Sequence, residues 1–179
     1  MPRNDSAIGM LVVALLLAGC GGKPTETPQQ RYDAAKTLFE QTLKNFHLAS
    51  AEAGKVEREK LLQQAADSYE RLLRNYAEQA SFAAQALRSL GNVRAAQGRL
   101  DEAVKLYARV EKEYPGQEWE ILQAWKSAAD LLWDAGHRPE ARPFYEKIIQ
   151  RFDKPDASAV IQTVVRGSKA RLAESGAKN

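Results

Sequence analysis

The sequence is poor in the residues that build disulfide frameworks and zinc sites. It has one cysteine and two histidines in 179 residues, which excludes an internal disulfide and a Cys/His zinc site. It also lacks a large charge excess, because 26 lysines and arginines face 23 acidic residues. A nucleic-acid-binding domain usually concentrates basic residues on one face, so this near balance argues against nucleic acid as a partner.

Long hydrophobic runs and the β-branched clusters of sheet proteins are scarce as well. The apolar run at residues 7–19 would reach about 20 Å as a helix, short of the roughly 30 Å hydrocarbon core of a membrane. What is present is 44% hydrophobic and 27% charged residues, the composition of a globular chain. The many alanines and the helical spacing of the apolar residues predict an all-α protein.

The N-terminus has the layout of a secretory signal peptide. Arg3 precedes the short apolar run, which ends in the sequence Leu-Ala-Gly before Cys20. This ending resembles the lipobox of bacterial lipoproteins, where two small residues precede an obligatory cysteine. The resemblance implies that residues 1–19 are removed and that the thiol of Cys20 carries a covalent lipid, with acyl chains such as palmitate as the membrane anchor. The alternative is a chance apolar start with a buried cysteine.

The residues after the cysteine bear on location and flexibility. In enterobacterial lipoproteins an aspartate directly after the cysteine favours the inner membrane, and Gly21 stands there instead. The resemblance therefore implies an outer-membrane anchor with the domain in the periplasm. Residues 21–30 carry no apolar side chain and two prolines, so we expect residues 20–30 to be a flexible tether and residues 31–175 to be the domain.

A period of 38 residues organises the rest of the chain. Alanines recur at that interval, and each is followed at offsets of 4, 7 and 11 by large apolar residues, which places all four on one helix face. The four sets are Ala65, Ala103, Ala141; Tyr69, Tyr107, Tyr145; Leu72, Val110, Ile148; and Tyr76, Tyr114, Phe152. Three copies of one amphipathic helix predict a repeat architecture.

A second helix precedes this one in each unit. The segments 84–97 and 122–135 are amphipathic, and Gly98 and Gly136 end them at matching places, as a C-terminal glycine in a left-handed conformation would. Pro115-Gly116 stops the following helix. Earlier in the chain a helix is predicted over Tyr32–Ser50, and the stretch 51–60 makes that hairpin longer.

The central copy resembles a tetratricopeptide repeat (TPR). The residues that carry the resemblance are Leu90-Gly91-Asn92, then Gln97-Gly98-Arg99-Leu100-Asp101-Glu102-Ala103, then Tyr107 and Pro115. It implies a solenoid of about three helical hairpins, and the amphipathic pattern of residues 157–172 predicts a C-terminal capping helix. The long period is similar to that of envelope TPR lipoproteins of the barrel-assembly and Tol–Pal-associated kind.

Catalysis is not indicated. His47 and His137 show no ligand spacing to another histidine or cysteine, and both are expected to be ordinary surface residues. Acidic pairs at i, i+2 diverge on a helix. We therefore expect no enzyme activity, metal or cofactor, apart from the covalent lipid.

In a TPR stack the first helices of successive hairpins line the concave face, where a partner protein or peptide binds. The residues expected there are Gln85, Arg88, Asn92, Gln123, Lys126, Asp130 and Trp133. Arg88 and Asn92, with Lys126 in the next repeat, resemble part of the clamp that some TPR domains use on a peptide carboxylate. The alternative is a solvated polar face, and Trp133 is equally compatible with partial packing.

Together these features predict a non-enzymatic, lipid-anchored adaptor for protein–protein interaction in cell-envelope assembly or maintenance. The alternative is a structural or oligomerising subunit of the pilot type, in an envelope or secretion complex. Self-association and the identity of the partner stay open.

Overall fold

The computed structural model describes residues 26–176, with side chains to residue 174. The predicted signal peptide, the lipidation site Cys20 and most of the predicted tether lie outside these residues. All regular structure in the described range is helical, and none of its helices is both long and apolar enough to cross a membrane.

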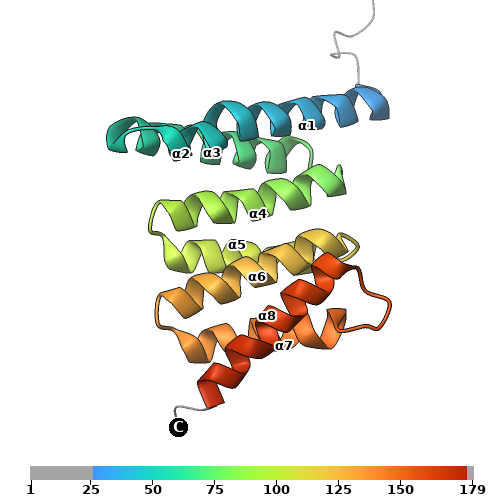
Figure 1. Ribbon diagram of the computed structural model, residues 1–179. Helices are drawn as coiled ribbons and strands as arrows, with labels where there is room; N and C mark the ends of the chain where they lie inside the picture. The colour runs from blue at the N-terminus through green and yellow to red at the C-terminus, as the bar shows by residue number, and fades with distance from the viewer. Residues whose placement is uncertain (1–25, 177–179) are drawn as a thin grey trace, which may run out of the picture.

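The described helices form three antiparallel hairpins and a final helix, stacked in chain order (Figure 1). This is an all-α, TPR-like solenoid with a C-terminal helix, as the period predicted. The first hairpin contains α1 (Pro28–Thr42), a π-helix η1 (Leu43–Leu48), α2 (Ala49–Glu52) and α3 (Lys55–Asn75). The second pairs α4 (Ala80–Ala96) with α5 (Leu100–Glu113), the third pairs α6 (Glu118–Asp134) with α7 (Arg138–Phe152), and α8 (Ala159–Gly176) follows.

The 38-residue pattern is the core of the solenoid. The three alanines are fully buried, and Tyr69, Tyr107 and Tyr145 are at most 2% exposed. The aliphatic residues at offset 7 are fully buried too. The alanine at the start of each pattern therefore lies inside the stack, and the tyrosine below it fills the space between helices, which confirms both expectations.

Close helix approach is most severe in the second hairpin. A Cβ atom added at Gly91 of α4 would lie 2.5 Å from Cε1 of Tyr107 on α5. The absence of a side chain at Gly91 thus lets the tyrosine ring lie directly against the backbone of α4.

The two predicted helix ends at glycine are confirmed. Gly98 and Gly136 have φ of +76° and +85°, the left-handed region that glycine enters without a Cβ penalty. At the first end, the Arg99 N–H donates to the Arg94 carbonyl and the Gly98 N–H donates to the Ala95 carbonyl, both at 2.9 Å. These two bonds form a Schellman motif and satisfy carbonyls that the helix end leaves open.

The first hairpin differs from prediction at both of its ends. The helix starts at Pro28, inside the predicted tether, because Thr27 and Gln30 form a capping box that satisfies backbone donors at the helix start. The predicted long connection at residues 51–60 is wrong, since only residues 53 and 54 lie between the helices. The additional residues instead lengthen α3 to 21 residues, and residues 55–60 are mostly good helix formers.

Candidate functional site

The predicted groove residues lie on the helices that open each hairpin. Gln85 and Gln123, Arg88 and Lys126, and Asn92 and Asp130 are each separated by 38 residues, so α4 and α6 present them in the same register. All six are half-buried. We call the surface that they form the first-helix face. It extends to α1 on one side and to α8 on the other, and Figure 1 is viewed from it, with α8 crossing in front of α7.

Arg88 is tied to the next repeat. Its Nε donates to Oε2 of Glu120 at 2.6 Å, and the two side chains are only 22% and 10% exposed. This ion pair joins α4 to the first turn of α6. The cation predicted to bind a partner carboxylate is therefore already matched by a carboxylate of the solenoid itself.

Asn92 and Asp130 are tied to the tyrosines of their own hairpins. The Tyr107 hydroxyl donates to Asn92 Oδ1 at 2.7 Å, and the Tyr145 hydroxyl donates to Asp130 Oδ1 at 2.8 Å. Asp130 Oδ2 accepts from Lys126 Nζ one turn earlier. Burial raises the pKa of Tyr107 to about 12. The pKa of Tyr145 is raised as well, first by burial and then by its bond to Asp130.

In the first hairpin His47 takes the place of these partners. Its Nδ1 lies 3.2 Å from the hydroxyl of Tyr69. Burial lowers the pKa of His47, and the nearby Arg88 guanidinium lowers it further, while burial raises the pKa of Tyr69 to about 12. The expectation that His47 is an ordinary surface residue is wrong, because the π-helix η1 adds to each turn and rotates this side chain inward. A π-helix has no signal in the apolar spacing that located the other helices.

Trp133 lies apart from the open part of this face. It is 6% exposed, and its ring meets the ring of Tyr145 edge-on at 5.8 Å between centroids. The guanidinium groups of Arg138 and Arg171 lie 5.0 and 5.4 Å from its ring centroid. The side chain is therefore packed rather than projecting into a groove, since residues of α7 and α8 cover it.

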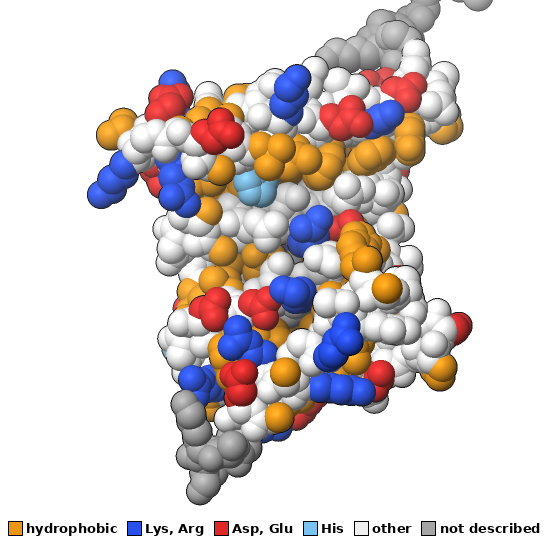
Figure 2. All heavy atoms as spheres, in the orientation of Figure 1, with side chains coloured by type: hydrophobic (Ala, Val, Ile, Leu, Met, Phe, Trp, Pro, Cys, Tyr) orange, Lys and Arg blue, Asp and Glu red, His pale blue; other side chains and the backbone are white. Residues whose placement is uncertain are grey.

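An exposed apolar edge borders the first-helix face. Tyr32, Trp119 and Val160 are 44%, 48% and 58% exposed, and Phe82 lies beside Tyr32 with ring centroids 5.2 Å apart. These four residues, which we call the apolar edge, lie near the starts of α1, α4, α6 and α8, and all four helices start on the same side in Figure 1. Figure 2 shows hydrophobic side chains along α1 and again on that side.

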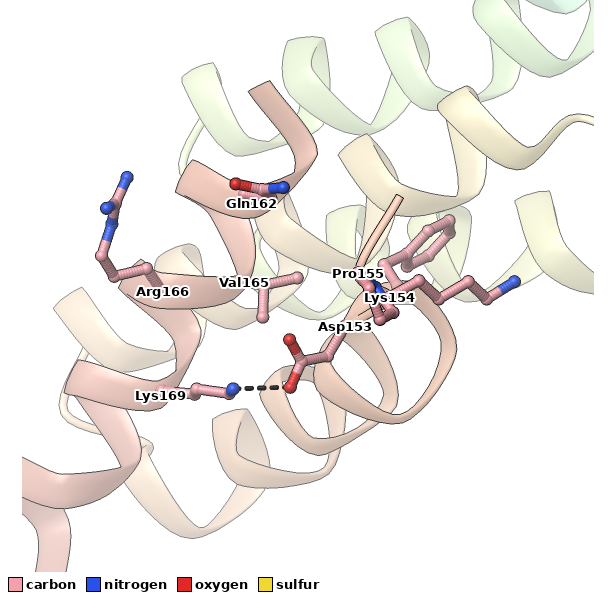
Figure 3. Close-up of a pocket in the computed structure, with 8 residues that line it drawn as sticks. Asp153, Lys154, Pro155, Gln162, Val165, Arg166 and Lys169 are labelled. Carbon is pink, nitrogen blue, oxygen red and sulfur yellow. Dashed lines mark ion pairs between the residues drawn. The ribbon is translucent and has the colours of Figure 1, made fainter. Parts of the chain in front are cut away.

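The cavities offer no evident catalytic constellation. A cavity of about 470 Å³ lies between the end of α7 and α8, where Lys169 pairs with Asp153. Figure 3 shows Lys154 and Arg166 extending in opposite directions, so these cations do not converge on one ligand atom. Among the residues that the structure describes, no three His, Cys, Asp or Glu side chains lie close enough together to hold a metal ion.

Sequence comparison adds one family. Residues 55–118, from α3 to the start of α6, match the model of the tetratricopeptide repeat family. This stretch carries tetratricopeptide repeats. TPR domains are generally protein–protein interaction modules and typically non-catalytic scaffolds. No curated protein matches the chain.

Proposed function

We propose that this chain is a lipid-anchored TPR adaptor that binds a protein segment on its first-helix face and serves cell-envelope assembly or maintenance. The apolar edge carries the proposal. Three large apolar side chains between 44% and 58% exposed lie beside a half-buried polar surface, and aromatic side chains of this kind often anchor protein interfaces.

The division of roles on the first-helix face decides where a partner makes contact. Arg88, Asn92 and Asp130 already bond to the solenoid, so a partner would have to break these bonds to use them. Gln123 is half-buried and lies four residues, or one helical turn, after Trp119. The proposed contact surface therefore runs from the apolar edge to the two glutamines.

Photocrosslinking in intact cells tests this surface. A photoreactive amino acid at Gln123 should give adducts of discrete mass, whereas the same residue at Ala108, exposed on α5, should not. An adduct at the mass of two chains would favour the oligomerising subunit instead. Equal adducts from both positions, or none from Gln123, would contradict binding on this face.

A matched pair of variants tests the apolar edge. Val160→Glu together with Trp119→Glu should abolish the Gln123 adducts, because it places two charges where apolar contact is proposed. Val56→Glu is the control, since Val56 is 87% exposed at the start of α3. All three substitutions are at exposed sites and should leave the helical circular dichroism spectrum intact. Retained adducts in the double variant would move the contact elsewhere.

The membrane anchor is tested separately. Cys20→Ala should abolish incorporation of labelled palmitate and release the protein from the outer-membrane fraction. Its resemblance to a lipobox and the position of Gly21 support the proposal. Sedimentation with the inner membrane would contradict the location while leaving the lipid in place.

A further inference from the structure

The repeat register shows where the first-helix face lacks an acid. Arg88 of α4 meets Glu120 of α6, and the equivalent cation one repeat later is Lys126. The residue 38 after Glu120 is Ser158, directly before α8. The interval between α6 and α8 thus keeps the cation and lacks the carboxylate that neutralises its counterpart.

A second cation lies in the same interval. Arg171 of α8 lines a cavity of about 250 Å³ together with Lys126, Asp130, Tyr145 and Ser168. Asp130 is the acid in that lining, so the cavity carries two cations and one anion. Its Oδ1 accepts from Tyr145 and its Oδ2 accepts from Lys126, which leaves Asp130 saturated by the protein.

Both cations are held in place with donors to spare. An ammonium group has three N–H donors, and the described partner of Lys126 is the single oxygen Asp130 Oδ2. Arg171 stacks on Trp133, and its ion pair with Glu174 is long, at 3.6 Å. A guanidinium offers five donors in a fixed fork that matches a carboxylate.

We propose that this cavity binds an acidic side chain of the protein segment held on the first-helix face, with its carboxylate between Lys126 and Arg171. The inference rests on the proposed function, since it assumes that a segment lies there. The incoming carboxylate supplies the charge that Glu120 supplies one repeat earlier.

Nuclear magnetic resonance titration of the full chain in detergent micelles tests the site. The probe is N-acetyl-glutamate amide, and N-acetyl-glutamine amide is the isosteric neutral control. The first should shift the backbone amide signals of Gly167 and Ser168 in a saturable way, and the second should not. N-acetyl-alanine, which has only a terminal carboxylate, separates a chain end from an acidic side chain, and stronger shifts from it would overturn the side-chain assignment.

Matched variants separate specific binding from general attraction to a basic surface. Arg171→Gln should weaken glutamate binding about tenfold, the loss expected for one charge-assisted hydrogen bond. Arg166→Gln, which removes an exposed arginine from the same helix, should leave binding unchanged. Equal weakening by both, or equal shifts from the glutamate and glutamine probes, would overturn the inference. Crosslinking from Gln123 would then still stand or fall on its own, so the two failures are distinguishable.

Discussion

Gly91→Ala is a direct test of the close approach between α4 and α5. The added Cβ would lie 2.5 Å from Cε1, 2.8 Å from Cδ1 and 3.1 Å from Cζ of Tyr107. Ordinary carbon contacts lie near 3.5–4.0 Å, so the ring would have to retreat by about 1 Å. It has little room, because Tyr107 is 2% exposed and its hydroxyl is bonded to Asn92.

Two opposing effects set the size of the change. Overpacking of a tight core costs about 1–3 kcal/mol, while alanine gains up to about 1 kcal/mol over glycine inside a helix. With two ring atoms closer than 3.0 Å, we expect a net loss of about 1–2 kcal/mol. Urea unfolding of residues 26–179, followed by helical circular dichroism, measures it.

Gly167→Ala is the matched control, because nothing lies within 4 Å of a Cβ at that position of α8. It should raise the free energy of unfolding by up to about 1 kcal/mol. In a Tyr107→Leu background the clash partner is gone, so Gly91→Ala should no longer destabilise. If Gly91→Ala stabilises the original chain as much as Gly167→Ala does, the reasoning about this contact is refuted.

Two further predictions concern pH. The pKa of His47 is lowered in the folded chain by burial and by Arg88, so its stabilising contribution is complete above the unfolded pKa of about 6.5 and decreases as the pH falls below it. His47→Gln should reduce the loss of stability on mild acidification in urea titrations, and an unchanged pH profile would contradict the burial of a neutral imidazole. The pKa values of Tyr69 and Tyr107 are about 12 when folded against about 10 when unfolded, so stability should fall as the pH rises through this interval. Tyr107→Phe should reduce that alkaline loss, and tyrosinate absorbance appearing near the ordinary pKa without unfolding would contradict it.

The repeat core could be predicted because each of its positions is required three times. A solenoid buries the same alanine and tyrosine in every hairpin, so the period in the sequence and the period in the structure have one cause. The irregular features could not be predicted in this way. The π-helix that rotates His47 inward occurs once, and the burial of Trp133 depends on Arg171, which is 38 residues away in α8.

The candidate site shows the same division. Residues that keep the period, such as Asn92 and Asp130, bond to the tyrosine of their own hairpin, so their recurrence reflects a structural need and does not indicate a ligand. A bound partner is one molecule with its own sequence, and nothing obliges its contacts to repeat. Positions that break the period are therefore the better candidates for recognition. Trp119 stands where the preceding repeat has Ser81, and Arg171 stands where it has Trp133, and both lie beside surfaces that the solenoid leaves open to a partner.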